Sequence, residues 1–391
     1  MNFVRENIKL FKFSRTEFAG ALGDMGTFIP LFVGLVSVCG LNPSNILVFS
    51  GLFNVISGIL FGIPIAVQPM KAIATIAISE KLTPQAIFAA GLVTGLVVFF
   101  LGVTNMISYL SKVVPKPVVR GLQLGLGLKL VITGMQMVAK TNTFMGYDSI
   151  LVGIFSMLLV LFLLFSRRLP GALVVFMFGF ILIFLKSPQI INTFKIGFSL
   201  PQFIIPAKSD FILGTIRMAV AQIPLTLLNS VVAVCALSRD LFPQRQLSPK
   251  RVCLSVGFMN LLGCFFGAMP MCHGAGGLAA QYRFGARTGA SIVSLGIFKI
   301  CIGVLFGVIT FKLFALFPQS VLGVLLLFAG FELAVVSRDM TNKADFFVMF
   351  LTAAATLALQ SIALGFLIGF VFSYLFIFGI LRLERLEEEN N

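Results

Sequence analysis

The chain has 391 residues, of which 58% are hydrophobic and 11% are charged, and its formal net charge is +15. Runs such as ILVGIFSMLLVLFLLF (150–165) are long enough to cross the hydrocarbon core of a bilayer. The short alternating segments of a β-barrel are absent, and the basic residues are scattered over short loops instead of gathered as on a nucleic-acid-binding surface. The composition therefore predicts an all-α polytopic membrane protein whose partners include membrane lipids and no nucleic acid.

Apolar runs separated by charges or by Gly and Pro define the expected spans in chain order. In the first half they cover residues 17–38, 46–62, 69–80, 83–104, 117–138, 147–165 and 169–186. In the second half they cover residues 212–237, 248–266, 271–282, 288–311, 318–336, 344–358 and 361–381. The pattern predicts about fourteen transmembrane segments, seven in each half.

The two halves match at a constant shift of 201 residues. Adding 201 carries Pro69 onto Pro270, Met70 onto Met271 and Pro117 onto Pro318. An odd number of spans in each repeat inverts the second copy, which is a common plan of secondary transporters. We expect a first inverted repeat over residues 1–200 and a second over residues 201–391.

The distribution of basic residues supports an odd number of spans in each half. With a cytoplasmic N-terminus, nineteen Lys and Arg residues fall on the cytoplasmic side and six on the other side. No short apolar core with a small-residue cleavage site follows the basic N-terminus, so a cleaved signal peptide is not expected. The sequence predicts a multi-pass protein of the bacterial inner membrane with both termini in the cytoplasm.

The two short runs, 69–80 and 271–282, are the most informative. Twelve helical residues rise about 18 Å, roughly half the hydrocarbon thickness. Each run follows a proline, which favours the first turn of a helix and disfavours helix before it. We therefore expect two half-helices, spans 3 and 10, that begin near the midplane after non-helical backbone. Such backbone is tolerated where it lines a cavity.

A site for a divalent oxyanion is predicted where these half-helices meet. Each N-terminus offers free N–H groups and about half a positive charge, and Lys71 adds a full charge. Glycines after His273 allow an anion to approach the backbone closely. The candidate substrate-binding residues are Gln68, Met70, Lys71, Cys272, His273, Gly274, Thr27, Thr226 and Asn229.

Several of these residues have structural alternatives. Asp24 can pair with Lys71 and pin two spans together, and the side chains of Thr226 and Asn229 can bond their own helix turn. Glu332 suits a structural or gating contact. The candidates for proton coupling are Asp24, His273 and Glu332. One histidine beside one cysteine is too small a set for a metal site or a catalytic centre, so we expect no cofactor and no enzymatic activity.

The glycine-rich stretch GLQLGLGL (121–128) lacks the Lys-Ser ending of a nucleotide-binding loop. It lies inside an apolar run, where small residues let helices pack closely. We therefore interpret it as a helix-packing surface.

Four stretches carry a family resemblance: EFAGALGDMGTFIPL (17–31), VQPMKAIA (67–74), PVVRGLQLGLGL (117–128) and PMCHGAGGLAAQYRFGARTG (270–289). They resemble signatures of the molybdate transporters related to the sulfate permeases. The resemblance implies a seven-plus-seven inverted repeat similar to that of uracil permease. Spans 1–4 and 8–11 would form a core that carries substrate between spans 3 and 10, and the other spans a gate. It also implies that no C-terminal regulatory domain follows the last span.

Residues and resemblance together predict a secondary transporter that takes up molybdate by alternating access, driven by protons. Sulfate is an alternative substrate because it has the same charge and tetrahedral shape as molybdate, and tungstate is a further candidate. Only the family resemblance favours molybdate over sulfate. An anion channel is a rival of another class, and an intramembrane enzyme is disfavoured by the lack of a catalytic constellation. A homodimer is left open.

Overall fold

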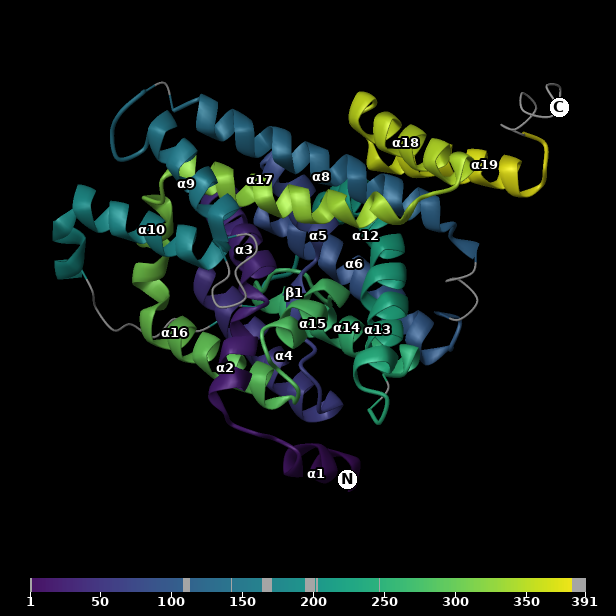
Figure 1. The fold of residues 1–391 in the computed structure, drawn as a ribbon, viewed down its shortest axis with the longest axis horizontal. Coiled ribbons are helices and arrows are strands. Elements are labelled where there is room, and N and C mark those ends of the chain that lie inside the picture. The colour runs from purple at the N-terminus through teal and green to yellow at the C-terminus, as the bar shows by residue number, and fades with distance from the viewer. Residues whose placement is uncertain are drawn as a thin grey trace.

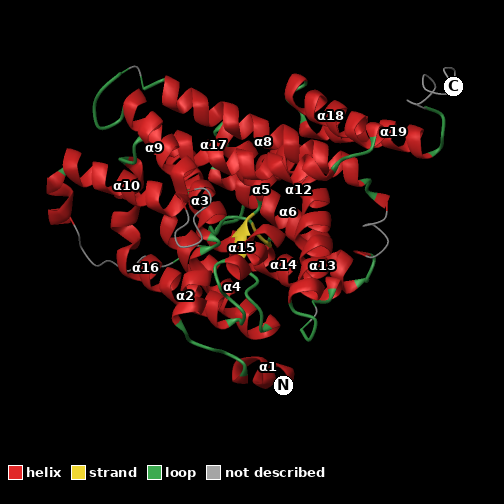
Figure 2. Cartoon of the chain, in the orientation of Figure 1, coloured by secondary structure: helices red, strands yellow, loops and turns green. Residues whose placement is uncertain are grey.

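The computed structural model of the chain describes residues 2–107, 113–141, 143–163, 171–193, 201, 203–245 and 247–381. This part of the chain is largely helical (Figures 1 and 2). Its strands are β1 (Val67–Pro69) and β2 (Met271–His273), which lie near the centre of the molecule. The two strands come from the two predicted repeats and pair with each other.

The helices of the first half are α1 (Asn2–Lys9), α2 (Arg15–Leu22), α3 (Met25–Cys39), α4 (Pro43–Phe61), α5 (Lys71–Glu80), α6 (Pro84–Val103), α8 (Lys116–Ala139), α9 (Ile150–Leu163) and α10 (Gly171–Lys186). Those of the second half are α11 (Lys208–Gly214), α12 (Val220–Leu225), α13 (Ala233–Leu241), α14 (Pro249–Gly263), α15 (Ala275–Arg283), α16 (Ala290–Ala315), α17 (Gln319–Val335), α18 (Lys343–Ala358) and α19 (Ile362–Ile377). The π-helical turns Thr215–Ala219 and Thr226–Val232 join α11, α12 and α13 into one run of 34 residues.

Each predicted apolar segment contains a helix or consecutive helices, and residues 164–165 and 169–170 of two segments lie outside the described residues. Five helices within the described residues are long and apolar enough to span a membrane, or six if the bent pair formed by Arg15–Leu22 and Thr27–Cys39 is one span. Four further apolar helices are shorter. The protein is thus a multi-pass membrane protein, and the count of fourteen spans stays a prediction.

The predicted start of one half-helix is wrong. Residues 271–273 form β2, and α15 begins only at Ala275. Because β2 pairs with β1, its backbone is extended where a helix was expected. The other half-helix, α5, begins at Lys71 directly after β1, close to the predicted residue 69.

Three helix pairs form the main packing of the molecule: α4 with α16, α6 with α14, and α8 with α17. A shift of 201 residues carries α4 onto α14, α6 onto α16 and α8 onto α17, so the same pairs recur after the shift. The helices α8 and α17 lie side by side along one edge in Figure 1, with α18 and α19 next to them.

Glycines bring α8 and α17 into close contact. A Cβ atom placed on Gly127 would lie 2.6 Å from the carbonyl oxygen of Gly330, and one on Gly330 would lie 2.5 Å from that of Gly127. On another face of α8, a Cβ atom on Gly121 would lie 2.5 Å from the carbonyl oxygen of Met349 on α18. The helix-packing interpretation of GLQLGLGL is confirmed.

Candidate functional site

The strands β1 and β2 cross antiparallel, with Gln68 opposite Cys272 and Pro69 opposite Met271. The Met70 N–H continues the ladder by donating to the Pro270 carbonyl at 2.9 Å. On the outer side of β2, the Asn260 side chain donates to the Met271 carbonyl at 2.6 Å and accepts from its N–H at 2.8 Å. The extended backbone of the two strands therefore finds hydrogen-bond partners within the protein, as a membrane interior requires.

The backbone N–H groups at the N-termini of the two half-helices differ in their hydrogen-bond partners. At the start of α5, Gln222 Oε1 accepts from the N–H groups of Ala72 at 2.9 Å and Ile73 at 3.2 Å. At the start of α15, the described residues provide no hydrogen-bond acceptor for the N–H groups of residues 275–277. The first turn of α15 therefore remains open to a ligand, whereas α5 already has a side-chain cap.

A small cavity lies at the open start of α15. Lys71 reaches it from α5, and Gly276, whose added Cβ atom would meet nothing within 4 Å, borders it from α15. The lining residues are Gln68, Lys71, Gln222, Leu225, Asn229, Ser230, Cys272, Gly274, Ala275, Gly276 and Leu333. The cavity thus combines a cation, free backbone donors, an amide and a hydroxyl.

A second small cavity adjoins the first at Lys71 and Leu333. Thr27 and Glu332 line it together with apolar side chains of α3, α8 and α17. Lys71 therefore stands between two spaces, one enclosed by the half-helices and one between α3 and the α8–α17 pair.

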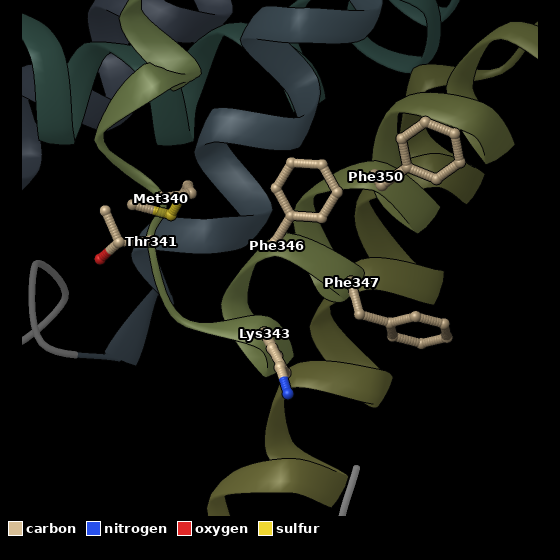
Figure 3. A pocket seen from close by; sticks show the side chains of 6 residues that line it. All are labelled: Met340, Thr341, Lys343, Phe346, Phe347 and Phe350. Atoms are coloured by element: carbon tan, nitrogen blue, oxygen red, sulfur yellow. The ribbon is translucent and has the colours of Figure 1, made fainter. Parts of the chain in front are cut away.

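A larger hollow lies at the start of α18 (Figure 3). Phe346, Phe347 and Phe350 form much of its wall, with Lys343 at its lower end. Since α18 lies at the edge of the molecule and its aromatic side chains are exposed, this hollow is a feature of the outer surface and not the candidate site.

The structure brings together most of the predicted ligands. Gln68, Lys71, Asn229, Cys272 and Gly274 line the first cavity, and Thr27 lines the second. Asn229 lies in the π-helical turns Thr226–Val232, where the wider turn changes the direction of the side chains. Such insertions in a helix frequently occur at functional sites.

Three predicted ligands lie elsewhere. The Met70 N–H is occupied by Pro270, and the Thr226 hydroxyl accepts from Gln222 Nε2 at 2.9 Å outside the cavity lining. His273 is buried on the opposite side of β2 from Cys272, because successive strand residues face opposite ways. Its ring lies 2.9 Å from Ser255 Oγ and 3.3 Å from the Ala66 carbonyl oxygen.

Asp24 takes its hydrogen bond from Gln68 Nε2, so the direct pairing with Lys71 considered as an alternative is not formed. Sequence reasoning missed Lys299 on α16, whose ammonium is buried and lies 3.4 Å from the centre of the Phe28 ring. A lysine inside an apolar run was the available signal. It also missed the role of Gln222 as the cap of α5, since that contact joins residues about 150 positions apart.

No group of three or more His, Cys, Asp or Glu side chains that could hold a metal ion occurs among the described residues.

Fold and site together define a multi-pass membrane transporter. Two solved transporters share the fold: the transmembrane domain of the cyanobacterial bicarbonate transporter BicA and murine Solute Carrier 26 family member A9, an anion transporter in the inward-facing state. BicA has a TM-score of 0.66 and 14% identity, covering 92% of this chain and 98% of that one. The murine protein has a TM-score of 0.70 and 15% identity, and the match covers 97% of this chain and 71% of the murine chain.

Sequence comparison identifies the family of the chain more narrowly than the fold does. Residues 16–130 and 214–333 match the family described as "Molybdate transporter of MFS superfamily". Molybdate transporter 2 of Arabidopsis thaliana is 40% identical, covering 98% of this chain and 91% of that protein. Molybdate transporter 1 of Chlamydomonas reinhardtii is 32% identical, covering 91% and 90%. The chain belongs to this molybdate transporter family.

Proposed function

We propose that the protein takes up molybdate across the membrane as a secondary active transporter. The observation that carries the proposal is the cavity between the half-helices, where Lys71 faces the uncapped first turn of α15. Family membership adds the cargo, because the similar curated proteins are named molybdate transporters.

Molybdate would sit between Lys71 and the N-terminus of α15. The lysine supplies a full positive charge and the helix end about half of one, together with N–H groups that point at the ligand. Asn229 and Ser230 can donate from the other wall of the cavity. Gln222 assists indirectly, because by capping α5 it fixes the backbone from which Lys71 projects.

The architecture that fits this function is an inverted repeat of residues 1–200 and 201–391. The helices α2 to α6 and α11 to α16 would form the core, and α8 to α10 with α17 to α19 the gate. Recurrence of the helix pairs after a shift of 201 residues supports this division. Movement of the core against the gate would then expose the site to each side in turn.

The present conformation is closed on one side of the site. The half-helix α5 packs on α8, whereas its counterpart α15 packs mainly on α2 and α13. Lys129 of α8 and Glu80 at the end of α5 form an ion pair of 2.7 Å across the closed side. With the termini in the cytoplasm, as the basic loops indicate, this is an inward-facing state in the bacterial plasma membrane.

Accumulation of a dianion against an inside-negative potential costs about 4.6 kcal/mol per 100 mV. Proton symport is the driving force that we propose. Glu332 lines the second cavity, and Asp24 is hydrogen-bonded to Gln68, which lines the first. Both are therefore favoured over His273, which lines neither cavity and whose ring contacts Ser255 and the Ala66 carbonyl oxygen instead.

Uptake of molybdate into proteoliposomes, with and without an imposed pH gradient, tests the proposal. We expect uptake that an inward proton gradient accelerates and that tungstate inhibits more strongly than sulfate does. Stronger inhibition by sulfate than by tungstate would assign the cargo to sulfate. Current through single open channels would assign the protein to the channel class.

A further inference from the structure

A buried hydrogen bond connects Asp24 to the cavity. Asp24, at the junction of α2 and α3, is 1% exposed and accepts a hydrogen bond from Gln68 Nε2 through its Oδ1 atom. Among the described residues, neither Asp24 Oδ2 nor Gln68 Oε1 has a hydrogen-bond partner. Because Gln68 also lines the cavity, a buried carboxylate reaches the substrate site through one amide group.

The charge on Asp24 decides how this amide is oriented. A carboxylate can only accept, so it holds the nitrogen of Gln68 and leaves the amide oxygen without a donor. The amide lies against the first turn of α15: an added Cβ atom on Gly277 would be 2.5 Å from Gln68 Nε2, and one on Gly274 would overlap Gln68 Oε1. With Asp24 ionised, the amide therefore offers an acceptor beside the predicted anion, which itself only accepts.

The surrounding charges favour binding of a proton together with the anion. Two ammonium groups, Lys299 and Lys71, interact electrostatically with Asp24. Lys299 is 3% exposed, and its Nζ has no hydrogen-bond partner among the described residues. Cys272 is the other titratable group beside Asp24, and the exposed Glu332 shares the second cavity with Lys71.

Two ammonium groups and one carboxylate give the buried site a net charge of +1. A bound dianion alone would make it −1, whereas a dianion with one proton on Asp24 would make it neutral. Because a buried net charge is costly, the neutral combination is favoured.

We propose that Asp24 and Gln68 form a proton-operated amide switch, in which protonation of Asp24 turns the Gln68 amide so that its nitrogen donates to the bound oxyanion. The proposal deepens the function proposed above and rests on it. A proton from the outer side binds the Asp24 carboxylate, and the resulting O–H donates to Gln68 Oε1. Nε2 then faces the cavity. On the inner side, loss of the same proton reverses the amide and releases the anion, so at least one proton accompanies each anion.

The variant Asp24→Asn tests the switch, because its side chain stays uncharged and can donate to Gln68 Oε1 at every pH. Asp345→Asn, the same change at an exposed site in the first turn of α18, is the matched control. Molybdate affinity of the purified proteins is measured between about pH 6 and pH 8. For wild type and control we expect the affinity to rise as the pH falls, by up to about tenfold per pH unit for one linked proton.

For Asp24→Asn we expect an affinity close to that of wild type at the acid end, with a smaller dependence on pH. Its uptake into proteoliposomes should not respond to a pH gradient, while exchange of labelled for unlabelled molybdate continues. Protonation of molybdate itself would change the affinity with pH equally in every variant. The test therefore compares the pH dependence of the affinity between variants. A wild-type slope in Asp24→Asn would overturn the switch and leave the transport proposal intact.

A second variant keeps the test informative if Asp24→Asn does not fold. Gln68→Leu removes the amide but keeps the Asp24 carboxyl, so we expect weaker binding and a smaller dependence of the affinity on pH than in wild type. A wild-type slope in Gln68→Leu would overturn the switch. No molybdate binding by wild type at any pH would instead refute the proposed function.

Discussion

The substitution Gly276→Ala separates folding from anion binding. Gly276 is the second residue of α15, is exposed to the cavity, and an added Cβ atom would meet nothing within 4 Å. Replacing a helical glycine by alanine stabilises a fold by about 0.4–1 kcal/mol where there is room. The methyl group would stand beside the N–H groups that we assign to the anion. We therefore expect an unchanged or higher melting temperature without ligand.

The same methyl group should weaken binding. If molybdate affinity falls about tenfold, the stabilisation at saturating molybdate falls by about 1.4 kcal/mol. Gly277→Ala is the matched comparison: its Cβ atom would lie 2.5 Å from Gln68 Nε2 and 2.8 Å from Asp24 Oδ1. Overpacking of this kind costs about 1–3 kcal/mol, so this variant should melt lower even without ligand.

The assay is a thermal-shift series on the detergent-purified proteins, with molybdate or chloride at matched ionic strength. The expected pattern is stability preserved and ligand response reduced for Gly276→Ala, and stability reduced for Gly277→Ala. A full molybdate response in Gly276→Ala would refute the assignment of the anion to the first turn of α15.

Substitutions of Lys71, of Gln222 and of the Glu80–Lys129 pair have definite expected outcomes. Lys71→Met should weaken molybdate binding by about 3 kcal/mol, roughly a hundredfold in Kd, measured by titration calorimetry; an unchanged Kd would remove Lys71 from the site. Gln222→Leu should lower the free energy of unfolding by about 1–3 kcal/mol, because two buried N–H groups lose their acceptor. Gln222→Glu should keep the fold but bind molybdate more weakly. Equal melting temperatures for wild type and Gln222→Leu would contradict the capping role. Glu80→Lys and Lys129→Glu should each slow uptake by weakening the closed side, and the double variant should restore it. Each of the two side chains is 23% exposed, so the expected coupling energy is only about 1 kcal/mol. Additive losses in the double variant would argue against a gate contact.

Much of the fold could be predicted because a membrane allows few solutions. Long apolar runs had to be helices, and Pro69 marked the point where α5 begins. The half-helix α5 begins two residues from the predicted position, since the local effect of a proline is enough to set it.

Local rules failed where the structure depends on contacts between distant segments. The β1–β2 pairing joins residues about 200 positions apart, and it replaced the predicted first turn at residues 271–273 with a strand. Strand geometry then turned His273 away from the cavity and Cys272 toward it. The Gln222 cap and the burial of Lys299 beside Phe28 likewise arise only from tertiary packing.

The central claim is that Lys71 and the start of α15 bind molybdate. Titration of the purified wild-type protein and of Lys71→Met with molybdate, tungstate and sulfate, read as thermal stabilisation over chloride, tests it most directly. We predict stabilisation of wild type by molybdate and tungstate at concentrations well below those needed for sulfate, and loss of that response in Lys71→Met. Equal stabilisation of both proteins by molybdate, or no response of wild type to any of the three anions, would contradict the claim.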